Sequence, residues 1–416
     1  MTSNLTLKKL FPKKNSKQKF YPLNGASLRD IDLIEGIKTI ISRQVTMSKK
    51  TKNFENIFKK KIKMKHALML NSGSSANLLA FQCLINPYRK KRLRVGDEVI
   101  VPAVCWSTSL WPIVQCGLKP VFVDVDKKTF NISLKDLEEK ITKRTRVIMM
   151  VHVLGNTTNM DALMEIKKKH NLILIEDTCE SLGSKYRKKF LGNFGEFSTF
   201  SFYFSHQISS VEGGMICCKS NQDLEIIKSL RSHGWARGLK NQKKIELRNK
   251  KIDKRFLFYN SGFNLRPTDI QASIGASQFR SLDKFIKIRK ANRKKIIDNL
   301  KKDKKWDNQV FFLMANNNVK PSWFGIPMIM NNKYKNDKKH ILNLLDENGI
   351  ENRPIISGNF TKQPAIKKYK LIEKKILFNN AEYIDQLGFF IGLPVKPISK
   401  NFLSKFNNKF FKSFIK

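Results

Sequence analysis

A carboxylate and an imidazole stand at the ends of two apolar segments, where they could do acid–base chemistry. The segment "LILIEDTCES" places Asp177 at the end of a predicted buried strand, with Glu180 three residues later. The segment "FYFSHQISSVEGGM" places His206 five residues after Ser201. A carboxylate at the end of an apolar strand is costly without a partner, and a protonated pyridine nitrogen is a suitable one because the pair keeps the ring an electron sink. A lone histidine is more often structural, but these surroundings favour proton transfer.

Two further segments have the residue types of a phosphate site and a ring-binding site. In "NSGSSAN", between a predicted strand and a helix, Gly73 permits a tight turn. Ser74 and the start of the helix would offer a hydroxyl and amides to a phosphate. The segment "PAVCWSTS" places Trp106 at the carboxyl end of a strand, where ligands bind in open α/β sheets. That indole could stack on a cofactor ring or belong to the core, and the sequence leaves both open.

The elements that must position these residues alternate between short apolar runs and amphipathic helical segments from about residue 66 onward. This alternation predicts an α/β fold with a mainly parallel sheet covered by helices on both faces. Thr268 and Gln271 predict the start of a long helix that runs to about Lys295. We expect an N-terminal arm and helix over 1–50, a large cofactor-binding domain over 51–295, and a smaller α+β domain over 296–416.

Composition narrows the classes of function. The 416-residue chain has a formal net charge of +46, but its lysines are scattered, so we expect solvated faces and no nucleic-acid partner. The positive electrostatic potential of such a chain would still attract a substrate that carries phosphates. We expect no membrane span and no secretory signal. Its six cysteines include no C-x-C or C-x-x-C pair, which predicts no metal or iron–sulfur site and a reducing, cytoplasmic setting.

In this order and spacing, the segments resemble the DegT/StrS family of fold type I, pyridoxal-phosphate-dependent sugar-nucleotide aminotransferases. Further motifs that match are "KPVFVDVD", "LGNFGEFSTFSF" and "GFNLRPTDIQASIGASQF", and the resemblance spans about residues 30–400. It implies a homodimer with shared active sites. It also implies a role for each matching residue: phosphate binding by Ser74 and Ser201, ring stacking by Trp106, pairing of Asp177 with the pyridine nitrogen, a position near the ring hydroxyl for Glu180, and contact of Asn264 with the neighbouring subunit's cofactor phosphate.

The sequence departs from the aminotransferases where they keep the lysine that binds the cofactor, because His206 occupies that position. Histidine forms no stable Schiff base but still moves protons, so we expect an untethered cofactor held as pyridoxamine phosphate. This departure, and "GNFTKQP" at 358–364, resemble the subset of 3-dehydratases that act on nucleotide-linked 4-keto-6-deoxyhexoses. The resemblance therefore implies removal of the 3-hydroxyl in deoxysugar and O-antigen lipopolysaccharide biosynthesis, with the cofactor amine regenerated from L-glutamate.

Other interpretations and weaker candidates stay open. The segment after "SHGW" lacks the cysteines of the iron–sulfur branch of that subset, so no cluster is expected. His233 and Arg237 are candidates for substrate contact, or simply surface-loop residues. An aminotransferase would need another lysine, such as Lys185 or Lys188, and a pyridoxal-phosphate-binding protein without turnover is a further alternative. The sequence does not give the base or the hexose of the substrate.

Overall fold

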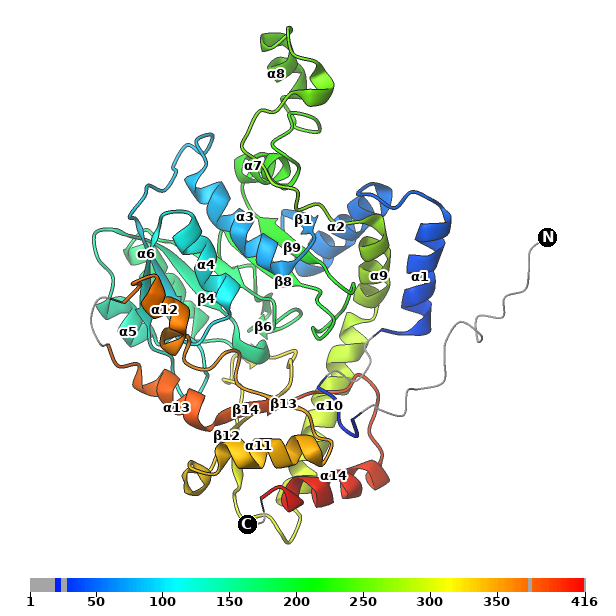
Figure 1. The fold of residues 1–416 in the computed structure, drawn as a ribbon, viewed down its shortest axis with the longest axis vertical. Coiled ribbons are helices and arrows are strands. Elements are labelled where there is room, and N and C mark those ends of the chain that lie inside the picture. Colours follow the sequence, from blue (N-terminus) through cyan, green and yellow to red (C-terminus); the bar gives the residue numbers. More distant parts are fainter. Residues whose placement is uncertain (1–18, 24–27, 373–375, 415–416) are drawn as a thin grey trace, which may run out of the picture.

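The large central sheet confirms the expected α/β architecture. The computed structural model describes residues 19–23, 28–372 and 376–414, and within them the sheet has seven strands in the order β1-β9-β8-β5-β4-β2-β3 (Figure 1). Neighbouring strands from β8 to β3 are parallel, whereas β9 runs antiparallel between β1 and β8. The strands are β1 (His66–Leu70), β2 (Glu98–Pro102), β3 (Lys119–Val123), β4 (Thr145–Val151), β5 (Ile173–Asp177), β8 (Phe197–Ser201) and β9 (Gly214–Cys218).

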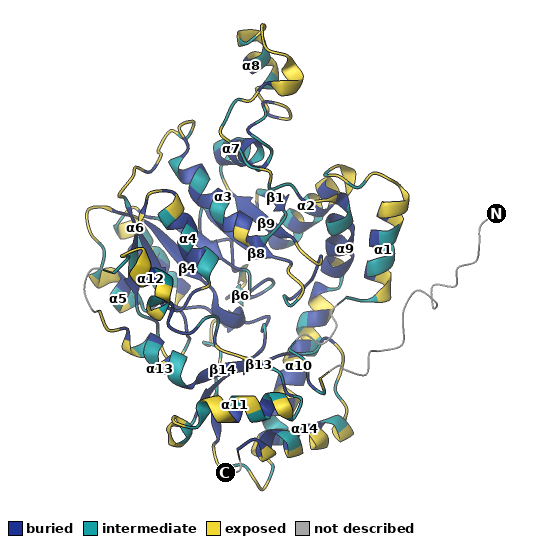
Figure 2. Ribbon diagram, viewed as in Figure 1, coloured by how far each residue is buried: buried dark blue, intermediate teal, exposed yellow. Residues whose placement is uncertain are grey.

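Helices cover both faces of this sheet because alternate strand residues point to opposite sides. In β4, Val147 and Met149 join the core cluster that contains residues of α3, α4 and α7, whereas Ile148 and Met150 pack with α5 and α6. The sheet strands are correspondingly buried (Figure 2). The helices of this part are α1 (Asp30–Ile41), α2 (Lys49–Ile62), α3 (Gly73–Ile85), α4 (Ser107–Gln115), α5 (Leu134–Glu139), α6 (Met160–Lys169), α7 (Asn221–Arg231) and α8 (Gln242–Arg248).

The prediction of one continuous helix from Thr268 to Lys295 is wrong. The Thr268–Gln271 capping box does open a helix, but this helix, α9 (Asp269–Arg280), ends before Ser281, and α10 (Leu282–Lys301) then begins. Ser281 has φ −97° and ψ 2°, and its hydroxyl accepts a hydrogen bond from Arg29 at 2.7 Å. A short polar side chain held in this way favours a helix end over a helix interior. The predicted domain boundary at residue 295 lies within α10.

The C-terminal part is smaller and has its own antiparallel sheet, in the order β10-β12-β14-β13 (Figure 1). Its last helix is basic and amphipathic. The elements are β10 (Val310–Phe312), β12 (Ile326–Met330), β13 (Asn352–Arg353), β14 (Gly388–Ile391), α11 (Lys338–Glu347), α12 (Pro364–Lys368), α13 (Asn379–Leu387) and α14 (Lys400–Lys412).

The two parts are joined by more than α10. A three-stranded sheet combines β11 (Val319–Lys320) with β6 (Lys185–Tyr186) and β7 (Lys189–Phe190). The backbone amides of Asn380 and Ala381, at the start of α13, each donate to the Asp124 carboxylate at 2.9 Å. Within the described ranges, the helices are all too short or too polar to cross a membrane.

Candidate active site

Asp177 lies at the carboxyl end of β5, buried among neutral hydrogen-bond donors. Its Oδ2 accepts from Asn77 Nδ2 at 2.9 Å and from Ser109 Oγ at 2.8 Å, and its Oδ1 accepts from the Cys179 amide at 3.1 Å. The Thr199 hydroxyl donates to Asn77 Oδ1 at 2.6 Å and so turns the amide nitrogen toward the carboxylate. These donors are neutral, so they satisfy the carboxylate oxygens without supplying a positive charge. The site therefore suits a cationic partner such as a pyridinium.

Gly73 brings the start of α3 against the end of β8. A Cβ atom at Gly73 would lie 2.6 Å from Ser201 Cβ and 3.0 Å from Cys179 Sγ, so only glycine allows this approach. The exposed Ser74 donates from Oγ to Thr108 Oγ1 of α4 at 3.1 Å, so the N-termini of α3 and α4 meet beside Asp177. Free amides at two helix N-termini favour an anionic group. The arrangement fits the phosphate and ring of a pyridoxal-type cofactor, although the individual role of each residue stays a prediction.

Glu180 lies near Asp177 and accepts a hydrogen bond from the Leu154 amide at 2.9 Å. Burial raises the pKa of Glu180 to about 7, the Leu154 amide opposes this, and the negative charge of Asp177 adds to it. Near neutral pH the carboxyl group therefore exists partly as the acid, which can donate a hydrogen bond. The predicted position beside a ring hydroxyl is compatible with that donor, and it remains a prediction.

We expect Glu180→Gln to stabilise the cofactor-free protein above pH 7. The folded-state pKa of about 7 lies above the ordinary 4.5. The contribution of Glu180 to the free energy of unfolding is therefore fully present below pH 4.5 and is lost as the pH rises through 7. Glutamine does not ionise, so the gain should grow across that window to about 3 kcal/mol. Urea unfolding at pH 5 and pH 8 measures it, with the exposed Glu212→Gln as the control. An equal effect of Glu180→Gln at both pH values would contradict the raised pKa.

His206 lies in the turn after β8, with its imidazole half-buried between two aromatic rings. The ring meets Phe324 edge-on at 5.2 Å and Tyr203 at 6.0 Å, and its Nδ1 is buried with no hydrogen-bond partner among the described residues. The pKa of His206 is lowered to about 4, chiefly by burial; the negative charge of Asp177 opposes this shift, and the positive charge of Arg289 contributes to it. The imidazole is therefore neutral at neutral pH, which is the state that a general base requires.

Trp106 is the N-cap residue of α4, and its side chain is 56% exposed. The segment 358–364, singled out in the sequence, runs beside the loop that leads to this tryptophan, since the Phe360 amide donates to the Ala103 carbonyl at 2.8 Å. An accessible indole at the carboxyl end of β2 is available for stacking on a planar ligand. The alternative that Trp106 belongs to the hydrophobic core is therefore wrong.

The remaining predicted residues gather in a second cluster around Trp235. The His233 ring lies 4.9 Å from the indole and the Arg237 guanidinium 4.5 Å from it. Arg266 lies 5.5 Å from the same ring and donates from Nε to Asn264 Oδ1 at 3.0 Å. Asn264 is exposed. Within one chain, the structure thus groups these three predicted residues with each other and not with Asp177.

Neither lysine proposed as a substitute for His206 faces Asp177. Lys185 lies in β6 with its ammonium 4.2 Å from the centre of the Phe190 ring, and Lys188 is exposed in the turn between β6 and β7. A cation on an aromatic face is already stabilised where it is. This placement weighs against an aminotransferase that uses either residue.

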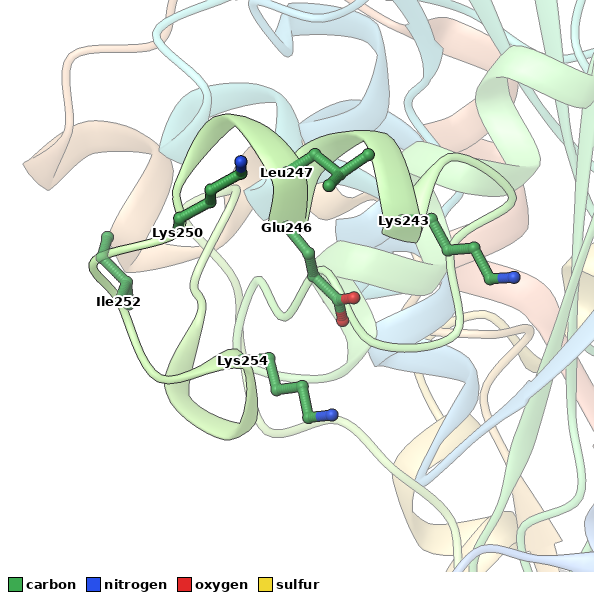
Figure 3. Close-up of a pocket in the computed structure, with 6 residues that line it drawn as sticks. All are labelled: Lys243, Glu246, Leu247, Lys250, Ile252 and Lys254. Atoms are coloured by element: carbon green, nitrogen blue, oxygen red, sulfur yellow. The ribbon is translucent and has the colours of Figure 1, made fainter.

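The segment that carries α8 projects at the top of the molecule (Figure 1) and has a hollow of its own. Figure 3 shows the side chains that line it, namely Lys243, Glu246, Leu247, Lys250, Ile252 and Lys254. This set shares no residue with the predicted site. Among the residues that the structure describes, there is also no group of three or more His, Cys, Asp or Glu side chains placed to hold a metal ion.

Sequence reasoning missed the residues that orient the two central groups. Asn77 and Ser109 lie inside the quoted motifs, and the need of a buried carboxylate for donors was a signal that could have pointed to them. Arg289 lies in α10, about 80 residues after His206, and no local pattern links the two.

The fold and the site define the class of pyridoxal-phosphate enzymes of fold type I, and known proteins agree with this assignment. A sequence model of the DegT/DnrJ/EryC1/StrS aminotransferase family matches residues 31–397. The GDP-4-keto-6-deoxy-D-mannose 3-dehydratase of Escherichia coli O55:H7 (strain CB9615 / EPEC) is 36% identical over 375 residues, which cover 89% of this chain and 95% of that protein. The chain belongs to the DegT/DnrJ/EryC1/StrS family.

Solved structures of similar proteins agree with the fold. E. coli GDP-4-keto-6-deoxy-D-mannose-3-dehydratase with bound hydrated PLP superposes with a TM-score of 0.86 at 33% identity, covering 94% of this chain and all of that one. A GDP-4-keto-6-deoxymannose-3-dehydratase with a trapped PLP-glutamate geminal diamine has a TM-score of 0.84 at the same identity, with 94% of this chain and 100% of that chain covered. The predicted family and fold type are therefore confirmed.

Proposed function

We propose that the protein is a pyridoxamine/pyridoxal-phosphate-dependent 3-dehydratase of a nucleotide-linked 4-keto-6-deoxyhexose, a lyase that yields a 3,6-dideoxy-4-keto sugar. The observation that carries this proposal is a neutral imidazole, His206, in place of the tethering lysine, near the buried carboxylate of Asp177. A relative and a solved structure that are similar over nearly the whole chain are both named as GDP-4-keto-6-deoxy-D-mannose 3-dehydratases, which makes a GDP-linked hexose the first substrate to test.

The residues divide the work between holding the cofactor and moving a proton. When bound, the cofactor supplies an amine for the 4-keto group and a ring that accepts electrons. Asp177 holds the ring nitrogen protonated, while Ser74, Ser201 and the N-terminus of α3 hold the phosphate. The His206 imidazole takes a proton from the carbon next to the ring and returns it to the leaving 3-hydroxyl.

The electrons and the amine of the reaction come from L-glutamate in this proposal. The 3-hydroxyl leaves as water, and hydrolysis of the carbon–nitrogen bond at carbon 4 restores the keto group and releases ammonia. The product then has one oxygen atom fewer, and glutamate is converted to 2-oxoglutarate. This balance needs no iron–sulfur cluster. The similarity to a protein trapped with a PLP-glutamate adduct supports this amino donor.

A homodimer in the cytoplasm completes the proposal. Asn264, which the family resemblance pairs with a neighbouring subunit's cofactor phosphate, is exposed and lies outside the cluster around Asp177. This placement supports a role for Asn264 at the site of a second copy. We place the reaction in the biosynthesis of O-antigen deoxysugars.

The test is to incubate the purified protein with pyridoxamine phosphate, L-glutamate and 4-keto-6-deoxyhexoses linked to GDP, CDP, UDP or dTDP. We expect one panel member to lose one oxygen atom, with one 2-oxoglutarate formed per product. In deuterated water the product should carry deuterium at carbon 3. A product that gains nitrogen at carbon 4 would identify an aminotransferase, and an unchanged panel with bound cofactor would favour a binding protein without turnover.

A further inference from the structure

Arg289 connects the loop after β8 that carries His206, called the catalytic loop below, to the C-terminal part of the chain. It lies on α10, its side chain is 3% exposed, and its Nη2 donates to the backbone carbonyl of His206 at 3.5 Å. Its Nε donates to the carbonyl of Leu393, just after β14, at 3.4 Å. The third nitrogen, Nη1, is buried with no hydrogen-bond partner among the described residues. One guanidinium thus contacts both the loop that carries the base and the small sheet.

The charge of Arg289 is not neutralised by these contacts. Both acceptors are carbonyl oxygens, and burial lowers the pKa of this arginine only to about 10, so it remains a cation at neutral pH. The charged and titratable groups that face His206 are Asp177 from β5, Arg289 from α10 and Tyr203 from its own loop. Phe324, which precedes β12, adds only an uncharged ring.

We propose that Arg289 is a positioning residue for His206, which fixes the backbone of the catalytic loop and adds a positive charge that, together with burial, disfavours protonation of the imidazole. The inference rests on the proposed function for its catalytic meaning. A neutral imidazole accepts a proton, and a neighbouring cation disfavours the imidazolium that results. The proton is then passed on readily to the leaving hydroxyl, so the same contact serves both halves of the proton transfer.

The direction of the His206 pKa shift supports this role. Burial is its largest cause, Asp177 opposes it, and Arg289 acts in the same direction as burial. Removing the charge at position 289 should therefore raise the pKa of His206, because the negative charge of Asp177 remains and favours the imidazolium.

Arg293 offers a matched control one helical turn later. It is 8% exposed, it lies 4.2 Å from the Trp323 ring, and it donates to the Leu313 carbonyl. Burial lowers its pKa to about 10 as well. Arg293→Gln thus removes a similarly buried charge from the same helix without removing a hydrogen bond to His206.

The experiment is an NMR titration of histidine imidazoles between pH 3 and 8 in the protein without substrate. The His206 signal is assigned by its loss in His206→Asn. We expect this signal not to titrate above pH 5 in the wild type. In Arg289→Gln its midpoint should rise by about one pH unit, whereas Arg289→Lys, which keeps the charge, and Arg293→Gln should leave it unchanged.

Two results would overturn the inference. One is a wild-type His206 midpoint at or above the ordinary value of about 6.5, which decides the matter even if the glutamine variant fails to fold. The other is a folded Arg289→Gln protein with an unmoved midpoint. The titration involves no sugar, so a shifted midpoint in a protein that converts no panel member would reject the proposed function and keep the link between Arg289 and His206.

Discussion

Replacing His206 by lysine should abolish formation of the 3-deoxy sugar and create a covalent bond between the protein and its cofactor. The lysine amine would attack the cofactor aldehyde from the position next to Asp177, and the tethered cofactor would no longer stay free as the amine. Loss of the imidazole should also remove general-base catalysis, which contributes about 10²–10⁴-fold. Product assays measure the first effect. Borohydride reduction followed by peptide mass analysis measures the second.

The control for this prediction is His206→Asn, which removes the base without supplying an amine. It should lose the same activity and give no borohydride-stable adduct, so the adduct in the lysine variant is assigned to the new side chain alone. Lys185→Arg and Lys188→Arg should leave wild-type turnover unchanged. Full 3-dehydratase activity in His206→Lys would show that the histidine has no essential role.

Replacing Asp177 by asparagine should lower kcat by about 10³-fold, equivalent to about 4 kcal/mol in the activation barrier. The neutral amide cannot hold a pyridine nitrogen protonated, so the ring becomes a poorer electron sink. Its own N–H groups would also meet the donors Asn77 Nδ2 and Ser109 Oγ, which now face a carboxylate oxygen. Steady-state kinetics gives the loss, and absorbance titration with pyridoxal phosphate gives the accompanying loss of affinity.

Ser109→Ala is the matched control, because it removes one hydrogen bond to Asp177 and keeps the charge. We expect a loss of no more than about tenfold, in line with one hydrogen bond to a charged group, about 1.5 kcal/mol. If Asp177→Asn and Ser109→Ala lowered kcat by the same small factor, Asp177 would be a structural residue and its proposed role in making the ring an electron sink would be wrong.

The sequence predicts the main features of the site because they depend on local pattern. An apolar run that ends in Asp177 places a carboxylate at the edge of the sheet, and the turn at Gly73 places a helix N-terminus at the same edge. The donors to Asp177 could not be predicted in the same way. Asn77 and Ser109 lie on two different helices, and only the three-dimensional packing of α3 and α4 brings them to one oxygen atom.

The helix break at Ser281 and the projecting α8 were not predicted, for different reasons. At the break, the Ser281 hydroxyl accepts a hydrogen bond from Arg29, about 250 residues earlier in the chain, and no local window contains this contact. The segment around α8 is rich in lysine and arginine and has a short helix with one buried side chain, Ile245. A helix with so little apolar surface has almost no periodic signal.

The pairing of β1 with β9 has a consequence for how the chain is made. β1 comes early in synthesis, but its hydrogen-bond partner emerges from the ribosome only about 150 residues later. Until then "HALML" is an exposed apolar strand edge, which is a hazard for aggregation. The turn with Gly73 directly follows β1, so the predicted phosphate-binding site at this turn cannot form before β9 is synthesised. We expect the nascent chain to depend on chaperones during this interval. Pyridoxal phosphate should bind only after the chain has left the ribosome.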